Sequence, residues 1–166
     1  MSNATTGECF VCRKHRGEIQ IPGGVIFEND LIYISHAQLW GAEKTHYLGH
    51  VFVEPKRHVA GLADLTEEEA QAVGVYTSRV AKALLSTEDM EHIYSFVIGD
   101  HVPHVHVHII GRYAGAPREY WGLKVDEWPN APHGDEYQIE QVATRLRNFL
   151  NDHWHDMTKS DFAATL

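Results

Sequence analysis

The chain has 166 residues, and its 14 Lys and Arg against 23 Asp and Glu give a formal net charge of -9 at pH 7. This length fits one ordinary domain with a sound core, and the acidic balance argues against a nucleic-acid-binding protein. The sequence has no signal-type apolar run at its amino terminus and no apolar stretch near the ~18 residues of a membrane span. We therefore expect a cytoplasmic protein that contacts neither nucleic acid nor membrane.

The amino-terminal part combines a polar leader with a pair of cysteines. Residues 1–8 are small and polar, which predicts a flexible leader. Cys9 and Cys12 are the only cysteines, and their spacing suits half of a Cys2His2 zinc site or a redox motif. A redox motif would require a thioredoxin-like βαβ context, whereas residues 13–17 and 22–24 are typical of turns, so a metal site is favoured.

The next part of the chain is rich in β-forming residues. Two such runs, 25–27 and 31–35, flank a polar turn and predict a hairpin. Residues 36–47 form a longer connection of a length that is often functional. Residues 49–58 then read as an extended segment that contains a proline near its end.

The remaining elements predict an α+β fold. Thr66 and Glu69 form a capping box at the start of an amphipathic helix over residues 66–86. A strand is expected at residues 93–98, and Asp135 is a suitable N-cap for a last helix that reaches about residue 151. Together these elements predict an antiparallel sheet with helices packed on one of its faces. We expect a single domain over residues 9–155 and a flexible tail over residues 156–166.

The most informative stretch is residues 104–110, which read His-Val-His-Val-His-Ile-Ile. Side chains alternate faces along a strand, so the three histidines share one face and the apolar residues share the other. Same-face neighbours lie roughly 6.5 to 7 Å apart, close enough to share a substrate or a metal. Burying three polar rings costs free energy unless each finds a partner, which favours a functional role over a purely structural one.

This pattern resembles the signature of the histidine triad (HIT) family of nucleotide hydrolases and transferases. A second stretch agrees with it, because Gly-His, an apolar strand and Pro-Lys-Arg-His over residues 49–58 match the segment that lies antiparallel to the triad strand in this family. The resemblance implies an antiparallel sheet with a long helix and a carboxyl-terminal helix, assembled as a homodimer. It also implies cleavage at the α-phosphate of a nucleotide conjugate.

The resemblance implies a role for each histidine of the site. Neutral imidazole is a competent nucleophile at pH 7, and the middle triad histidine, His106, is the residue implied to form the covalent intermediate with phosphorus. His108 is implied to contact phosphate oxygens, and His50 to belong to the same polar cluster. In zinc-containing bacterial members the ligand positions correspond to Cys9, Cys12, His58 and His104. Four protein ligands leave no open position, so such a zinc would be structural.

Four positions depart from the family or are only loosely matched. Asp100 and His101 stand where relatives carry a glutamine and a small hydroxyl residue, and we expect His101, charged through Asp100, to donate a proton to the leaving group. His36 stands where many members bind the ribose hydroxyls, so it is expected to contact substrate. Trp121 is the residue expected to reach the site of a partner subunit.

Two alternatives remain open at this point. The same pocket can serve a non-catalytic nucleotide-binding protein. The three triad histidines can also be ligands of a catalytic metal, although the paired cysteines disfavour that hypothesis. Metal analysis and a screen of nucleotide conjugates for turnover distinguish these hypotheses.

Overall fold

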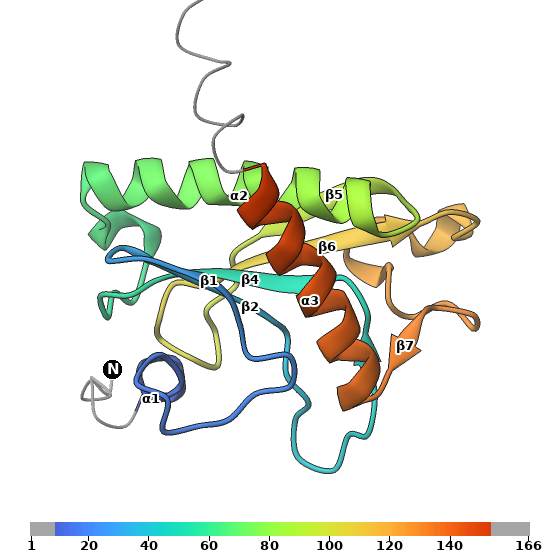
Figure 1. The fold of residues 1–166 in the computed structure, drawn as a ribbon, viewed down its shortest axis with the longest axis horizontal. Helices are drawn as coiled ribbons and strands as arrows, with labels where there is room; N and C mark the ends of the chain where they lie inside the picture. The colour runs from blue at the N-terminus through green and yellow to red at the C-terminus, as the bar shows by residue number, and fades with distance from the viewer. Residues whose placement is uncertain (1–8, 154–166) are drawn as a thin grey trace, which may run out of the picture.

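A computed structural model describes residues 9–153. The expected leader at residues 1–8 and the expected tail at residues 156–166 lie outside these residues. Seven strands and three α-helices are found in the described part. In chain order they are α1 (Phe10–His15), β1 (Val25–Glu28), β2 (Ile32–His36), β3 (His46–Tyr47), β4 (His50–Pro55), α2 (Glu67–Thr87), β5 (Met90–Phe96), β6 (Val107–Tyr113), β7 (His133–Gly134) and α3 (Glu136–Asp152) (Figure 1).

Five strands form one antiparallel sheet in the order β1-β2-β4-β6-β5. The β1–β2 pair is the hairpin predicted from the sequence. At the centre, β4 pairs with β6 so that His50 lies opposite Ile110 and Phe52 lies opposite His108. This register brings the Gly-His segment beside the triad segment. The strands β3 and β7 form a separate two-stranded sheet.

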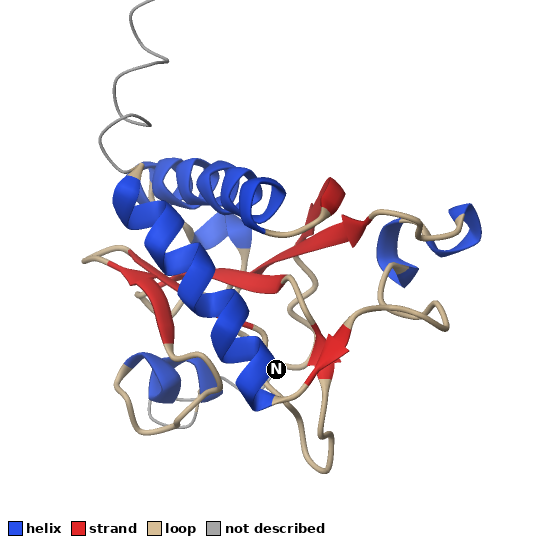
Figure 2. Ribbon diagram, turned by 45° about the vertical axis from the view of Figure 1, so that its right-hand side comes forward, coloured by secondary structure: helices blue, strands red, loops and turns tan. Residues whose placement is uncertain are grey.

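The two long helices begin as their sequences predict. The Thr66 hydroxyl accepts a hydrogen bond from the Glu69 N–H, and the Glu69 carboxylate accepts one from the Thr66 N–H, so the capping box of α2 is present. Asp135 and Gln138 make the same exchange at α3. Both helices lie on one side of the sheet (Figures 1 and 2), with α2 against β4, β5 and β6 and α3 against β1.

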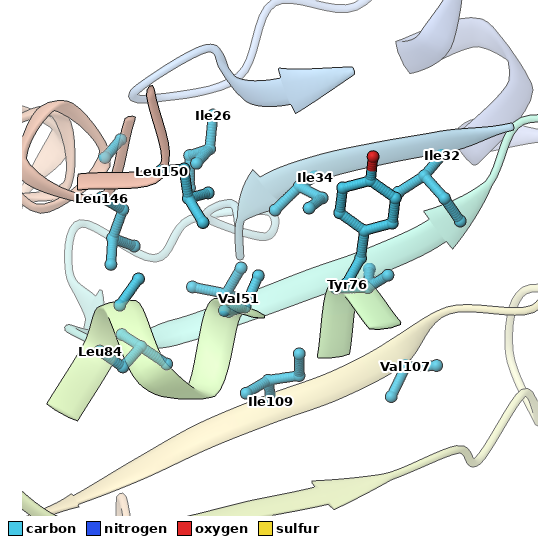
Figure 3. Close-up of a cluster of buried hydrophobic side chains, with 14 of the residues drawn as sticks. Ile26, Ile32, Ile34, Val51, Tyr76, Leu84, Val107, Ile109, Leu146 and Leu150 are labelled. Carbon is cyan, nitrogen blue, oxygen red and sulfur yellow. The ribbon is translucent and has the colours of Figure 1, made fainter. Parts of the chain in front are cut away.

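The core fills the space between the sheet and these helices. Side chains such as Ile34, Val51 and Ile109 project from alternating positions of the strands toward Leu84 of α2 and Leu146 of α3 (Figure 3). All five are at most 1% exposed. This burial occupies one face of the sheet and leaves the histidine-bearing face for other contacts. The predicted α+β fold, with both helices packed on an antiparallel sheet, is confirmed.

Two element boundaries differ from the prediction. The triad strand β6 begins at Val107 and not at His104, because the ladder with β4 ends at the Val53–Val107 pair and the Val105 N–H donates instead to the Val59 carbonyl at 2.8 Å. Strand β5 covers Met90–Phe96, where residues 93–98 were expected. Strand β5 lies at the edge of the sheet, and its first residues include exposed polar side chains. These side chains interrupt the apolar pattern from which a strand is predicted.

The segment after the first cysteine is helical where turns were expected. Helix α1 begins after Cys9, whose carbonyl accepts the Arg13 N–H at 3.0 Å. A helix of six residues is too short to show an apolar period in the sequence. It lies on the side of the sheet away from α2 (Figure 1), where Lys14 reaches the histidine-bearing face. None of the described helices is both long enough and apolar enough to cross a membrane.

Candidate functional site

A cavity of about 570 Å³ opens on the sheet face opposite the core. The triad segment, β4 and the loop before the triad all contribute to its wall. The lining residues are Trp40, Phe52, Ile98, Gly99, Asp100, His101, Val102, His106 and His108. Its walls therefore combine apolar and aromatic surface with a few imidazoles and one carboxylate, the usual composition of a site for an organic ligand.

His106 presents one particular ring nitrogen to this cavity. Its Nδ1 lies 2.6 Å from the backbone carbonyl oxygen of His104. A carbonyl only accepts hydrogen bonds, so Nδ1 carries the proton and Nε2 of the neutral ring carries the lone pair. The ring edge packs against Phe52, with ring centroids 5.5 Å apart. The cavity thus contains an imidazole whose tautomer and orientation suit nucleophilic attack.

His108 also lines the cavity and is the first of three connected imidazoles. Its Nδ1 is 3.0 Å from Nε2 of His50, and Nδ1 of His50 is 3.0 Å from Nε2 of His46. Phe52 and Phe96 pack against the His108 ring, with centroids 4.8 and 4.7 Å away. Burial, together with the nearby charge of His106, lowers the pKa of His108 to about 4, so the ring is neutral at pH 7. His108 can therefore accept or donate a hydrogen bond without carrying charge.

The connection between His46 and His50 depends on a tight turn. Residues 48 and 49 separate β3 from β4, and Gly49 has a φ of +91°. This backbone conformation favours glycine because an L side chain would be strained there, and a Cβ would also lie 2.1 Å from Cε of Met90, which would have to move. The turn places the two rings at the ends of the flanking strands, with centroids 5.2 Å apart.

A second cluster lies beside the cavity, between α1 and the start of the triad segment. Four potential ligand atoms, from Cys9, Cys12, His58 and His104, lie within 4.8 Å of one another. The Sγ atom of Cys12 is 3.4 Å from Nδ1 of His58 and 3.5 Å from Nδ1 of His104. A tetrahedral zinc site with ordinary Zn–S and Zn–N bonds separates such atoms by about 3.6 Å. The geometry therefore fits a four-coordinate metal ion.

His104 is oriented for this role by its other nitrogen. Nε2 of His104 donates a 2.8 Å hydrogen bond to the Pro55 carbonyl, which leaves the Nδ1 lone pair directed at the thiols. Metal-bound histidines commonly have such a backbone partner. In the metal-free protein, burial and the neighbouring Cys9 raise the pKa of Cys12 to about 11, so a metal must displace a thiol proton to bind.

A buried ion pair lies next to the cavity and the Cys/His cluster and joins α1 to β4. Lys14 of α1 is 2.8 Å from the Glu54 carboxylate and 3.2 Å from the Ser35 hydroxyl, and His15 is 2.9 Å from the same carboxylate. Burial acts to raise the pKa of Glu54, but the Lys14 charge and the His15 hydrogen bond outweigh it and lower this pKa to about 2. The pair fixes α1, and with it both cysteines, on the sheet.

The other predicted site residues lie in different places. Asp100 and His101 line the cavity and are exposed. In the described residues no hydrogen bond or ion pair is found between them, so the expected charging of His101 by Asp100 has no direct contact behind it. Trp121 lies on the loop after β6, where Arg112 stacks 3.7 Å above its ring and its indole N–H donates to the Ala116 carbonyl.

His36 does not face the cavity, contrary to the expected contact with substrate. It is fully buried; its Nδ1 donates to the Ala37 carbonyl at 2.8 Å, and its Nε2 accepts the Gly49 N–H at 3.1 Å. The period of two places it on the same face of β2 as Ile34, which belongs to the core. Both ring nitrogens are already used, so His36 stabilises the turn at Gly49 and offers no atom to a ligand.

Three residues of this site were not predicted from the sequence. Glu54 shares a strand face with His50, and a carboxylate in an otherwise apolar strand was an available signal. His46 lies four residues before His50, but its relevance depends on the turn at Gly49. Lys14 carries no local signal, since only the folded structure brings it to Glu54.

Comparisons with known proteins agree with this geometry. The sequence model of the HIT domain family matches residues 18–115 of this chain. The nitrilase and fragile histidine triad fusion protein NitFhit of Caenorhabditis elegans is 39% identical over 75 residues, which are 40% of this chain and 16% of that protein. The chain thus spans about a sixth of that curated relative.

Two solved structures share the fold across nearly the whole chain. A hypothetical histidine triad nucleotide-binding protein from Sulfolobus tokodaii has a TM-score of 0.68 at 16% identity and covers 92% of this chain and 98% of its own. A Zn-bound histidine triad family protein from Mycobacterium smegmatis has a TM-score of 0.68 at 18% identity, with 92% and 99% covered. Because the domain model matches more than half of the residues, this chain belongs to the HIT domain family.

Proposed function

We propose that this protein is a nucleotide hydrolase or nucleotidyl transferase that cleaves at the α-phosphate of a nucleotide conjugate. Dinucleoside polyphosphates and nucleoside phosphoramidates are the substrate classes. The observation that carries the proposal is the tautomer of His106, a residue that lines the cavity, because its Nδ1 proton is held by the His104 carbonyl at 2.6 Å and Nε2 keeps the lone pair. Membership of the HIT domain family supports a nucleotide ligand.

The reaction begins with attack of the His106 Nε2 lone pair on the α-phosphorus. The P–N bond forms as the bond to the leaving group breaks, and the product is a phosphoramidate on His106. Water, or another acceptor in a transferase, then attacks phosphorus and releases the ring. His108, between Phe52 and Phe96, lines the same cavity as His106, and its Nδ1 is hydrogen-bonded to His50.

The leaving group needs a proton, and His101 is the proposed donor. It lines the same cavity as His106 and lies in the loop between β5 and β6. Asp100 lines the cavity next to it. A carboxylate at this position repels a second anion, so it bears on which leaving groups are accepted.

The proposed cofactor is one structural zinc per chain, held by Cys9, Cys12, His58 and His104. The S–N separations of 3.4 and 3.5 Å fit such an ion, and a bound zinc would supply a rigid link between α1, the segment after β4 and the triad segment. His104 and His106 are two residues apart, so this link would fix the backbone carbonyl that sets the His106 tautomer. The alternative in which the three triad histidines bind a catalytic metal conflicts with these directions, because Nδ1 of His104 points to the thiols.

Assembly and location follow the same proposal. We expect residues 9–155 to act as one domain, and the protein to form a homodimer in the cytoplasm. Light scattering should then give about twice the chain mass of 18.8 kDa. A monomer at micromolar concentration would contradict the dimer and would leave Trp121 without a partner site.

The deciding experiment is a screen of nucleotide conjugates for turnover. Release of a nucleoside monophosphate from at least one dinucleoside polyphosphate or phosphoramidate is expected, together with a trapped nucleotidyl adduct on His106. Binding of nucleotides without turnover of any conjugate would instead establish the second candidate, a non-catalytic nucleotide-binding protein. With a buried structural zinc, the enzyme is expected to keep both its metal and its activity in the presence of a chelator. With a catalytic metal on the triad histidines, the enzyme would lose activity under the same conditions.

A further inference from the structure

A row of three hydrogen-bonded imidazoles leads from the cavity toward the surface. The row consists of His108, His50 and His46, joined by two N···N contacts of 3.0 Å. At the inner end, Nε2 of His108 is buried and has no hydrogen-bond partner in the described part of the chain. At the outer end, Nδ1 of His46 faces the Glu43 carboxylate at 4.0 Å, and the Glu43 side chain is 52% exposed.

The chemistry of imidazole allows this row only two neutral arrangements. Each neutral ring has one N–H and one lone pair, and each N···N contact needs one of each. The three rings therefore carry their protons either all on Nδ1 or all on Nε2. With all protons on Nδ1, His46 presents an N–H to Glu43, and the buried Nε2 of His108, a residue of the cavity wall, carries a lone pair. With all protons on Nε2, His46 has a lone pair on the nitrogen that faces Glu43, and His108 has an N–H at Nε2.

The surroundings favour neutral rings and the first arrangement. Burial lowers the pKa of His108 to about 4, and it lowers the pKa of His50 well below its usual value. Burial also lowers the pKa of His46, against the opposing charge of Glu43. The remaining charged and titratable groups around His46 are His133, Asp126 and the edge of the His36 ring, whose centroid is 6.3 Å away. The negative charge of Glu43 attracts the Nδ1 proton, which selects the form with the His108 lone pair in the cavity.

We propose that His46 is the outer member of a proton relay through His50 and His108, and that it sets the ring nitrogen that His108 presents to the cavity. Its use in catalysis rests on the function proposed above. There, the relay accepts the proton of the water that hydrolyses the His106 adduct. His46 is thus a positioning residue, because it acts through His50 and touches no substrate itself.

The proton balance of this step is complete. As the water oxygen forms its bond to phosphorus, its proton passes to Nε2 of His108. The Nδ1 proton of His108 passes to Nε2 of His50, the Nδ1 proton of His50 passes to Nε2 of His46, and the Nδ1 proton of His46 leaves to Glu43 or solvent. Every ring ends neutral and in the other tautomer. The row returns to its first form when the emptied cavity exchanges protons with water.

The fold itself does not need the His46 ring. Strand β3 pairs with β7 through the backbone, with His46 opposite Gly134 and Tyr47 opposite His133. Tyr47 is fully buried and anchors this strand by donating its hydroxyl proton to the Gly111 carbonyl at 2.8 Å. A ring without nitrogen atoms at position 46 therefore keeps the shape and removes only the relay.

The first test reads the tautomers directly and requires no turnover. Long-range 1H–15N spectra of histidine-labelled protein should show His50 and His108 protonated on Nδ1. In His46→Phe, the Nδ1 proton of His50 would lose its acceptor, and unpaired buried N–H groups are rarer than unpaired acceptors. His50 should then move its proton to Nε2, which forces His108 to do the same. The control His92→Phe, at an exposed position of β5, should change neither ring. Unchanged tautomers in His46→Phe would overturn the relay.

The second test separates the two halves of the reaction with a nitrophenyl ester of a nucleoside monophosphate. This leaving group needs no proton, so the burst of nitrophenolate should be the same in wild type and His46→Phe. The steady rate, which reports hydrolysis of the adduct, should fall about tenfold or more, as expected when proton transfer is impaired. An unchanged steady rate would overturn the catalytic use of the relay. Absence of any turnover by the wild type would reject the proposed function instead, and the tautomer spectra would still decide the relay.

Discussion

Two regions of the molecule take histidines from the same short segment and leave different ring nitrogens free. In the metal-binding cluster, His104 donates from Nε2 to the Pro55 carbonyl, so Nδ1 faces the thiols. In the cavity, His106 donates from Nδ1 to the His104 carbonyl, so Nε2 is available. The residue type is identical in both regions. The position of a backbone carbonyl decides which nitrogen does the chemistry.

The two regions also differ in how completely their groups are satisfied. The cluster of Cys9, Cys12, His58 and His104 turns all four ligand atoms toward one point, which is suited to a closed structural site. The cavity instead keeps Nε2 of His108 buried without a partner in the described residues. A buried polar atom of this kind costs stability and is expected where a ligand completes the bonding. Substitutions on each side should therefore have separable effects.

The largest expected effect is on the cavity side. His106→Ala should lower turnover of any nucleotide conjugate by at least about 1,000-fold, because it removes the nucleophile of a covalent route. Nucleotide binding, measured by calorimetry, should remain, and so should the zinc content. The exposed His92→Ala is the matched control. Unchanged turnover in His106→Ala would refute the mechanism and the contrast between the two regions.

On the metal side, substitution should affect stability before chemistry. One zinc per chain is expected by elemental analysis of protein purified without added metal. Cys9→Ser and His58→Ala should each lose the metal and lower Tm by roughly 10 °C, since a structural zinc contributes several kcal/mol to folding. Retention should also weaken as pH falls, because protons compete for the thiol groups and burial raises the Cys12 pKa. Full zinc occupancy in both variants would remove the assignment.

A smaller effect tests whether a second residue of the cavity moves protons. His101→Ala should slow conjugates with basic leaving groups by about 100-fold, the usual contribution of a general acid. Substrates with good leaving groups should react at nearly the wild-type rate. The ratio of the two rates is the measurement, since misfolding or metal loss would affect both equally. Equal slowing would assign the proton donor elsewhere.

Much of this fold followed from local patterns in the sequence. The capping box at Thr66 and the N-cap at Asp135 mark both long helices, because each depends on hydrogen bonds within one turn of helix. The triad pattern marks the site because its period of two separates polar from apolar faces. The family resemblance then identified the four residues that the structure brings together as a possible metal site.

The remaining errors concern contacts between segments far apart in the chain. The partner of the Val105 N–H is Val59, and no local pattern indicates that the ladder with β4 stops before it. Lys14 and Glu54 are 40 residues apart and meet only through the docking of α1. His36 was assigned to the substrate by its position in a motif, whereas the pleat of β2 turns it to the core. The tautomer of His104 depends on a distant partner of the same kind, the Pro55 carbonyl, and is likewise absent from the sequence.

The smallest prediction uses His36, which repeats the His106 geometry without its function. Its Nδ1 also donates to a carbonyl, but Nε2 accepts the Gly49 N–H, so the ring must stay neutral in the folded protein. Burial lowers its folded pKa to about 4, whereas the unfolded value is about 6.5. The unfolded chain therefore binds the proton first, and the stability from this ring is present above pH 6.5 and lost as pH falls toward 4.

The measurement is the change in Tm between pH 7 and pH 5.5. Over this interval His36 should contribute a loss on the order of 1 kcal/mol, or roughly 3 °C. His36→Gln should have a lower Tm at pH 7 but a shallower decline, whereas His92→Gln should decline like the wild type. Zinc release at low pH would act on all three proteins alike and cancels in the comparison. If Tm fell equally in the wild type and in His36→Gln, the His36 ring would not be the group that titrates. A fixed tautomer alone would then not make a histidine sensitive to pH.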